Sequence, residues 1–145
     1  MLSKKFFTRL GKVKVLKMFK AHIFDRATDV RGNKFRGYSA KYGEKKRAGT
    51  LPRQWAGSTG TKAPIVTGDF KNNLKFRGAT NNQFKIGWDS RGGLVNYLAD
   101  MGRIVTEEKN PFPKDVVIEI ERQVIREIKR HKDMKSKHHK IVLGK

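Results

Sequence analysis

Histidine and acidic side chains are the residues of this chain that could bind a metal ion or transfer a proton, but their spacing favours neither role. His138 and His139 are adjacent, whereas His22 and His131 are distant in the sequence. No acidic residue accompanies them at the spacing of metal ligands. We interpret the adjacent pair as part of a lysine-rich basic tail. The sequence therefore predicts no metal site.

Other catalytic patterns are equally weak. Asp69, Asp89 and Asp100 are scattered, and we expect them at turns and helix ends rather than as a catalytic pair. The glycine-rich stretch GYSAKYGEKKRAG lacks the Gly-Lys-Ser/Thr ending of a phosphate-binding loop. A single Arg-Gly-Gly at Arg91 is too little to indicate an RNA-binding repeat. We expect no enzymatic activity and no cofactor.

Size and composition limit the architecture. The 145 residues predict a single domain, 1–145, with a modest core. Hydrophobic residues make up 37% and charged residues 32%, which leaves room for long solvated or partner-covered segments. The absence of cysteine excludes disulfides and thiolate metal sites. No apolar run approaches the roughly 18 residues of a transmembrane helix, and the basic amino terminus lacks the features of a signal peptide. We expect a protein that is made and used in a cytoplasm, or assembled into a particle there.

The net charge of +21 is unevenly distributed. Residues 1–62 hold 17 Lys/Arg against 3 acidic residues, residues 63–112 hold 7 against 5, and residues 113–145 hold 10 against 5. Such an excess attracts nucleic acid or acidic protein surfaces. The candidate charged contacts are Lys12, Lys14, Lys17, Lys20, Arg130, Lys135 and Lys137. The nearly neutral middle third is the expected folded centre.

Residues 1–30 are predicted to be a basic segment with one helix. Leu16, Phe19 and Ile23 recur at helical spacing, which favours a helix near Leu16–Ala27. Val13 and Val15 alternate with lysines, so a strand that enters this helix is also possible.

Residues 31–62 are rich in glycine, lysine, arginine, serine and threonine, which predicts an extended arm instead of long regular elements. A structureless loop of this length is unusual unless it wraps a partner. Its aromatic residues favour a segment that becomes ordered against neighbouring subunits. The candidate inter-subunit residues are Phe35, Tyr38, Tyr42 and Trp55.

Residues 63–130 are predicted to form an α+β core. A short helical turn is expected from Asp69 to about Asn73, followed by an antiparallel hairpin in which NLKF and FKIGW present one apolar face. A helix near 94–101 ends at Gly102, and Pro111 and Pro113 precede a long helix from Lys114 to about Arg130. Residues 131–145 are predicted to be a frayed or partner-bound basic tail. The expected core residues are Leu74, Phe76, Phe84, Ile86, Trp88, Val117, Ile120, Val124 and Ile128.

The order of four stretches resembles the virion-morphogenesis proteins of tailed bacteriophages, which are the neck and tail-completion proteins that join heads to tails. These stretches are FRGYSAKYGEKK, APIVTGDFKNNLKF, FKIGWDSRGGLVNYLADMGR and PFPKDVVIEIERQVIREI. In that family a Thr-Gly run opens the sheet, here Val66 to Phe70. A strand that ends in Ile-Gly leads to a helix carrying Tyr97 and Gly102, and a Pro-x-Pro turn starts the last helix. The resemblance covers roughly residues 35–130.

This resemblance implies an α+β subunit in which a small antiparallel sheet packs against the terminal helix. It also implies assembly as a ring, often six-fold, in the neck or at the top of the tail. The implied partners are other copies of the chain, the head connector or adaptor, and tail-tube or tail-terminator proteins. Genomic DNA in the channel is a further possible contact, and no membrane is expected.

A basic nucleic-acid-binding protein of ribosomal type is the alternative function. The charge, the glycine-rich arm and the interleaved aromatic residues favour it. Against it, the positive charge avoids the predicted sheet, where an RNA-binding platform would need it.

Overall fold

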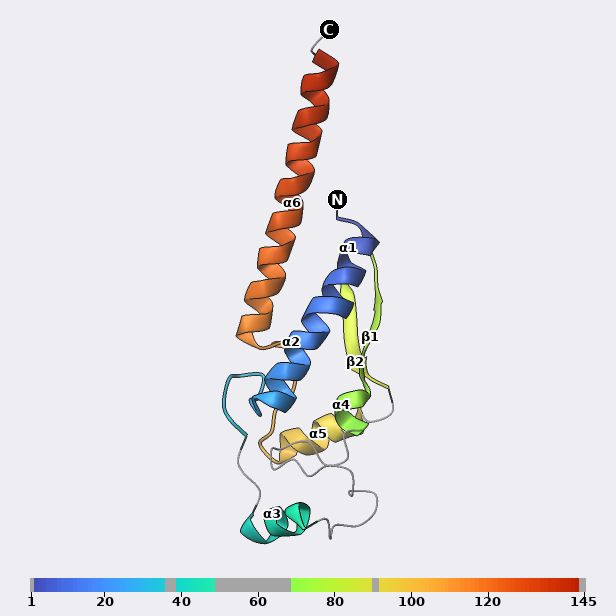
Figure 1. Cartoon of the computed structure of the whole chain (residues 1–145). Coiled ribbons are helices and arrows are strands. Elements are labelled where there is room, and N and C mark those ends of the chain that lie inside the picture. The colour runs from blue at the N-terminus through green and yellow to red at the C-terminus, as the bar shows by residue number, and fades with distance from the viewer. Residues whose placement is uncertain (1, 36–38, 49–68, 90–91, 144–145) are drawn as a thin grey trace.

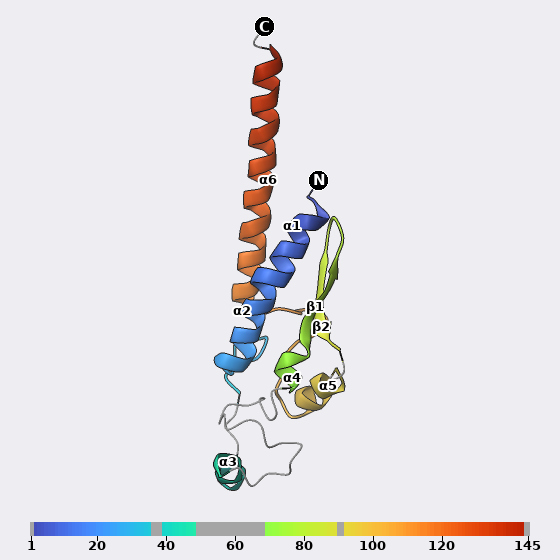
Figure 2. The same ribbon diagram turned by 45° about the vertical axis from the view of Figure 1, so that its right-hand side comes forward.

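A computed structural model describes residues 2–35, 39–48, 69–89 and 92–143. The first helical run lies between a two-stranded hairpin and the lower part of the long C-terminal helix (Figures 1 and 2). This arrangement of helices with a small antiparallel sheet is the predicted α+β class. Within the described residues, no helix is long and apolar enough to cross a membrane.

Residues 4–25 form one continuous helical run, called the N-terminal helix below. It consists of α1 (Lys4–Arg9), a π-helical segment (Leu10–Val15), α2 (Leu16–Lys20) and a second π-helical segment (Ala21–Asp25). Ser3 caps its start, because the hydroxyl accepts a hydrogen bond from the Phe6 amide at 3.2 Å. The helix therefore begins well before the predicted Leu16, and the strand considered at Val13 and Val15 is absent.

The N-terminal helix supplies much of the core. Its buried apolar side chains are Phe6, Phe7, Leu10, Val15, Phe19, Ile23 and Phe24. The expectation of a core confined to residues 63–130 was therefore wrong. The sequence suggested a basic segment because residues 4–25 hold seven Lys/Arg against one acidic residue, Asp25, although their apolar residues are more numerous.

The predicted hairpin is confirmed, together with the short helix before it. α4 (Asp69–Asn72) leads into β1 (Leu74–Ala79), which pairs antiparallel with β2 (Phe84–Trp88). Leu74 lies opposite Trp88 and Phe76 opposite Ile86, so the alternating apolar residues share one face. The register shifts between Phe76 and Gly78, which marks a β-bulge, and Gly78 has a positive φ of 141°.

Gly11 sets the distance between the N-terminal helix and the hairpin. A Cβ atom at this position would lie 2.8 Å from ring carbons of Phe84 and 2.9 Å from the ring of Phe76. Those separations are too short for any larger side chain unless the rings move. The missing side chain therefore allows the aromatic face of the hairpin to rest directly on the helix backbone.

α5 (Gly93–Asp100) is the short helix expected before Gly102. Gly102 has a φ of 75° and follows the C-cap Met101, and the Arg103 amide donates to the Leu98 carbonyl at 2.8 Å. Leu98 is buried and Val95 packs against the same core. One face of α5 thus anchors it to the molecule.

α6 (Lys114–Leu143) begins after the buried Pro113 and continues far beyond the predicted end near Arg130. The expected frayed tail is helical as far as Leu143. Val116 is fully buried, and Ile120 and Val124 are partly buried against the cluster that the N-terminal helix forms with Val116. Two predicted core residues, Val117 and Ile128, are exposed, because α6 packs on the N-terminal helix rather than on the hairpin, and that contact covers a different side.

The start of the predicted arm belongs to the folded body. The Asp29 carboxylate accepts hydrogen bonds from the amides of Arg31 (2.9 Å) and Asn33 (2.7 Å), which closes a tight turn. Phe35 packs against the main core cluster. Further along, α3 (Ala40–Arg47) is helical. The prediction of one extended arm over 31–62 is therefore wrong for 31–35 and 40–47, and residues 49–62 lie outside the described residues.

A matched pair of valines tests the central position of the N-terminal helix. Val15 is fully buried, whereas Val13 is 64% exposed on the same helix. Val15→Ala should destabilise the protein by about 2 kcal/mol relative to Val13→Ala, because it removes buried methyl groups and leaves a cavity. Both changes raise helix propensity equally, so that term cancels. Urea unfolding measures the difference, and equal midpoints would contradict this packing.

Candidate functional site

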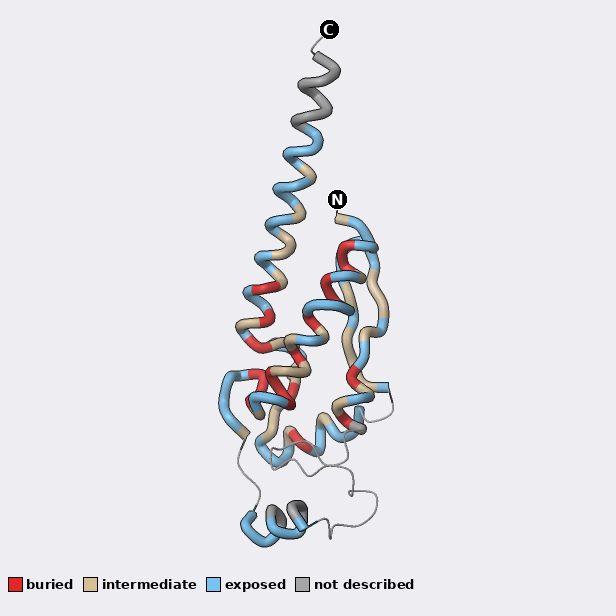
Figure 3. The backbone as a smooth tube through the Cα atoms, viewed as in Figure 1, coloured by how far each residue is buried: buried red, intermediate tan, exposed pale blue. Residues whose placement is uncertain are grey.

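Most of α6 projects beyond the folded body. At 1.5 Å per residue its 30 residues span about 45 Å. The buried part of the described helix is confined to its first two turns, at Val116 and Glu119 (Figure 3). Ile120 and Val124 continue this packing into the third turn, where they are partly buried. Beyond Val124, no apolar side chain of the described part of α6 joins either core cluster.

Exposed apolar side chains nevertheless continue along α6. At about 100° per residue, four of them, Val117, Ile118, Ile125 and Ile128, fall within an arc of about 100° on the helix surface, whereas Met134 lies outside this arc. Their exposed fractions lie between 38% and 52%. Contiguous apolar surface of this kind on a soluble protein usually marks an interaction site. We call the four residues on this arc the α6 stripe: Val117, Ile118, Ile125 and Ile128.

Ion pairs hold the first turns of α6 in place. The Lys14 ammonium lies 2.6 Å from the Glu119 carboxylate, and the Gln123 amide donates to the same carboxylate at 2.7 Å. Hydrogen bonds from Lys14 and then Gln123 lower the pKa of Glu119 to about 2. Lys14, which the sequence suggested as a partner contact, is therefore engaged inside its own chain.

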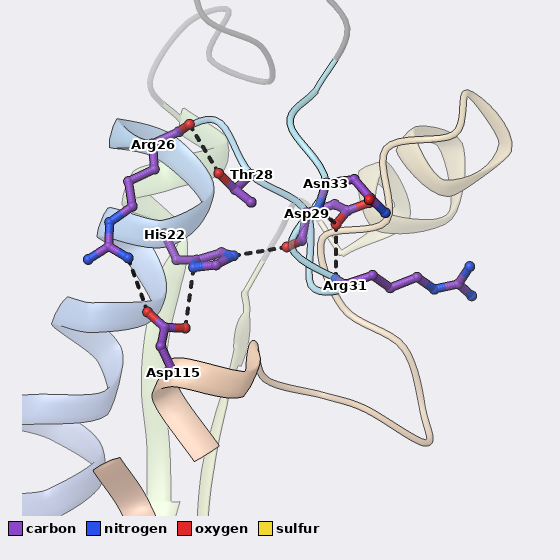
Figure 4. Close-up of polar contacts among 7 residues, drawn as sticks. All are labelled: His22, Arg26, Thr28, Asp29, Arg31, Asn33 and Asp115. Atoms are coloured by element: carbon purple, nitrogen blue, oxygen red, sulfur yellow. Dashed lines mark hydrogen bonds and ion pairs between the residues drawn. The ribbon is translucent and has the colours of Figure 1, made fainter. Parts of the chain in front are cut away.

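A second polar group joins the N-terminal helix, the Asp29 turn and α6 (Figure 4). His22 is buried, and its Nε2 donates to the Asp29 carbonyl at 2.9 Å. On the other side of the ring, Nδ1 lies 3.4 Å from Asp115 Oδ1. Arg26 reaches the other oxygen of Asp115 at 3.1 Å. The start of α6 is thus fixed from two sides.

This polar group does not have the geometry of a catalytic site. Asp29 contributes its backbone carbonyl to His22, while its side chain is occupied by the turn. Among the described residues, no serine or threonine hydroxyl hydrogen-bonds to His22, and the hydroxyl of Thr28 donates to the Arg26 carbonyl. Across the described residues, no group of three or more His, Asp or Glu side chains could hold a metal ion. The arrangement fastens three segments together.

The basic side chains have different environments. Lys12 and Lys17 are exposed on the N-terminal helix, and Lys135 is exposed on α6. Arg130 pairs with Glu127 at 3.8 Å. The side chain of Lys137 lies outside the described part of the chain. These positions are not gathered at one point, so the predicted charged contacts form separate surfaces.

Lys20 belongs to a small basic cluster. Burial lowers the pKa of its ammonium group, and the nearby charges of Lys71 and Lys75 lower it further. Lys71 also pairs with Asp25 at 3.1 Å, and Lys75 pairs with Asp89 at 3.2 Å. Positive charge from the N-terminal helix, α4 and β1 therefore converges here.

The structure does not bring the four predicted inter-subunit aromatic residues together within its described part. Phe35 is partly buried and packs against the core of its own subunit. Tyr38 and Trp55 lie outside the described residues, as does the side chain of Tyr42 within α3.

α5 carries a second exposed apolar surface that sequence analysis missed. Leu94, Tyr97 and the C-cap residue Met101 are exposed beside the buried Leu98, and Tyr97 is 61% exposed. Leu94, Leu98 and Met101 recur at helical spacing in the sequence, which predicts a single apolar face. The signal that could have separated them is Tyr97, which extends the apolar surface around more of the helix than one core contact can cover. We call Leu94, Tyr97 and Met101 the α5 patch.

Comparison of the chain with family models, with curated proteins and with solved structures finds no match.

The Lys14–Glu119 pair predicts a specific loss of stability in acid. The folded-state pKa of Glu119 is about 2, below its ordinary value of 4.5. Its contribution is therefore complete above about pH 4.5 and is lost as the pH falls toward 2. Glu119→Gln should reduce the difference between unfolding midpoints measured at pH 5 and at pH 2. Glu121→Gln, at an exposed position on the same helix, is the control and should leave that difference unchanged.

Proposed function

We propose that this protein is a structural subunit of a tailed bacteriophage virion, a neck or tail-completion protein that joins the head connector to the tail. In this proposal copies of the chain assemble as a ring, and the chain performs no catalysis. The α6 stripe is the observation that carries the proposal, because it is apolar surface that the subunit itself leaves uncovered. The order of the four sequence stretches that resemble the virion-morphogenesis family is the reason for proposing a virion.

The way in which α6 is mounted supports an assembly role. Its first turns are fixed by Val116, by the Lys14–Glu119 pair and by Asp115. The rest of the helix projects from this base (Figure 1). A rigid projecting helix can reach a neighbouring subunit without rearrangement of the core, so little ordering entropy opposes association.

We favour acidic protein surfaces over DNA as the partners of the exposed lysines. In a neck the genome must slide through the channel, and tight phosphate contacts would retard it. Lys14 already pairs with Glu119, and Lys71 and Lys75 pair with aspartates. These pairs leave less free charge for phosphate than the net charge suggests.

A nucleic-acid-binding protein of ribosomal type is the second candidate. The cluster of Lys20, Lys71 and Lys75 favours it, because converging ammonium groups attract phosphate. Salt-dependent RNA binding by a protein that remains monomeric at every concentration would support this candidate over the virion subunit.

Removing the apolar character of the α6 stripe tests the proposed assembly. Ile118→Gln combined with Ile125→Gln keeps helix propensity and adds no charge. Both side chains are about half exposed, so the stability of the monomer should change little, by about 1 kcal/mol or less. Light scattering over a concentration series should show the wild type forming a ring and the variant remaining monomeric.

Arg126→Gln is the matched control, since Arg126 is an exposed residue of α6 outside the stripe. It should assemble like the wild type. A wild-type chain that is monomeric at all concentrations, alone and with a tail-tube partner, would overturn the proposal.

Salt separates the two candidate functions. We expect joining of heads to tails to survive a rise from about one to three times physiological ionic strength. The Debye length is ~8 Å at the start of this range and becomes shorter as salt is added. An apolar interface persists when the charges at its rim are screened. Retention of DNA by the free protein should fall steeply, with a log–log slope near −0.9 per phosphate contact. If joining and retention fell together with the same slope, the basic residues would be DNA-binding elements.

A further inference from the structure

Two buried polar atoms face each other where α6 begins. His22 Nδ1 and Asp115 Oδ1 lie 3.4 Å apart, and both atoms are shielded from solvent. Among the described residues, neither atom has a hydrogen-bond partner. Such atoms are uncommon in folded proteins, because a buried donor or acceptor without a partner has lost its bonds to water and gained nothing in return. The arrangement of protons at this contact therefore needs a physical explanation.

The hydrogen bond on the opposite side of the ring decides which protons His22 carries. Its Nε2 lies 2.9 Å from the Asp29 carbonyl oxygen, which can only accept, so Nε2 holds a proton. In a neutral imidazole Nδ1 then has a lone pair, and this lone pair would face a carboxylate oxygen. Two acceptors in contact repel each other, and at 3.4 Å no water molecule fits between them. A second proton, on Nδ1, makes the same contact attractive, because an imidazolium ion then faces a carboxylate.

Two charged side chains accompany the ring on its own side of the contact (Figure 4). Arg26, one turn further along the N-terminal helix, donates to Asp115 Oδ2 at 3.1 Å. The Asp29 carboxylate is engaged in its own turn, where it accepts from the amides of Arg31 and Asn33. Only the backbone carbonyl of Asp29 therefore contacts the ring.

On α6, Asp115 is the acid that reaches the ring, since Glu119 is directed to Lys14. A proton on Asp115 Oδ1 would also join the two atoms, but it would neutralise the carboxylate that Arg26 binds. A proton on His22 Nδ1 leaves that ion pair intact. The carboxylate then contacts a cation through each of its oxygens.

We propose that His22 is an imidazolium ion in the folded protein, and that its second proton makes the mounting of α6 sensitive to pH. With both nitrogens protonated, the ring bridges the Asp29 turn and the start of α6. Without the proton on Nδ1, this bridge is replaced by a contact between two acceptors. The other ion pairs at the base of α6 use the exposed cations Arg26 and Lys14, so water and salt weaken them. Loss of one proton therefore loosens the base from which α6 projects.

The sign of the pH effect follows from the surroundings of the ring. In the folded protein an acceptor lies on each side of the imidazole, whereas water surrounds it in the unfolded chain. The folded state therefore binds the proton more firmly. Stability then falls as the pH rises through the range of about pH 5 to 8 in which imidazole loses its charge. This direction is opposite to that of Glu119, whose contribution is lost as the pH falls toward 2.

Urea unfolding at about pH 5.5 and about pH 8.5 measures the effect on stability. The wild type should be less stable at the higher pH. Asp115→Asn should remove most of this fall, because the asparagine amide can donate to an unprotonated Nδ1. The side chain of Asp115 is 40% exposed, so this variant should fold. His22→Gln should remove the fall as well, and the double variant should remove no more than either change alone.

Glu121→Gln is the matched control, since it also removes one acid from α6 but at an exposed position. It should show the same fall in stability as the wild type. If Asp115→Asn retained the whole fall, or if Glu121→Gln lost it, the proton would not lie between His22 and Asp115, and the inference would be wrong.

Nuclear magnetic resonance of the ring nitrogens tests the protonation directly. At about pH 5.5 both nitrogens of His22 should carry protons that exchange slowly with water, because both are buried. The spectrum of His22→Gln identifies its signals among the four histidines. A single ring proton, on Nε2, would overturn the proposal.

Spin labels on introduced cysteines report the mounting of α6, since the chain has no cysteine of its own. Lys12→Cys and Arg126→Cys place labels at exposed positions of the N-terminal helix and of α6. The distribution of distances between them should be broader at about pH 8.5 than at about pH 5.5, and Asp115→Asn should abolish this difference. Equal widths without Asp115→Asn would show that the proton does not control α6. Dilute single subunits suffice for these measurements, so their outcome does not depend on whether the chain forms a ring.

Discussion

The contact of the Gly11 backbone with the rings of Phe76 and Phe84 is the constraint on which the packing of this protein depends. With no side chain between them, the hairpin lies flat on the N-terminal helix. Two strands alone are marginally stable in water, so this helix is what gives the hairpin a buried face. Phe112 then packs edge-to-face on Phe19, with ring centroids 5.3 Å apart, and delivers the chain to the start of α6.

The protein consists of a folded body around the N-terminal helix and a long helix, α6, most of which projects from that body (Figure 1). Apolar contacts dominate on the hairpin side of the N-terminal helix, and ion pairs add to them where α6 begins. Surface ion pairs contribute little individually, but a buried histidine and a short Lys–Glu contact fix an orientation. These contacts fix the direction of α6 at its first turns. They do not involve the projecting part of the helix.

The sequence predicted the helices and strands better than it predicted which of them pack against each other. The hairpin, α4, α5 and the beginning of α6 were predictable because each has a local pattern, such as the alternation of Phe84, Ile86 and Trp88. The N-terminal helix was predicted only in part, since Ser3 and Gly11 act through capping and close approach, which periodicity does not register. The exposure of Val117 and Ile128 was not predictable either, because a stripe shows which face is apolar and not how much of it is covered.

The order of the elements along the chain has a consequence for how the protein is made. The N-terminal helix leaves the ribosome before the elements that cover it, because the hairpin begins at Leu74 and α6 begins at Lys114. At about 5–20 residues per second, its aromatic face waits for several seconds without a partner. The lysines on its other face repel neighbouring nascent chains during that time. Like charge opposes association of chains in general, so the positive charge bears on the unfolded polypeptide as well as on the folded protein.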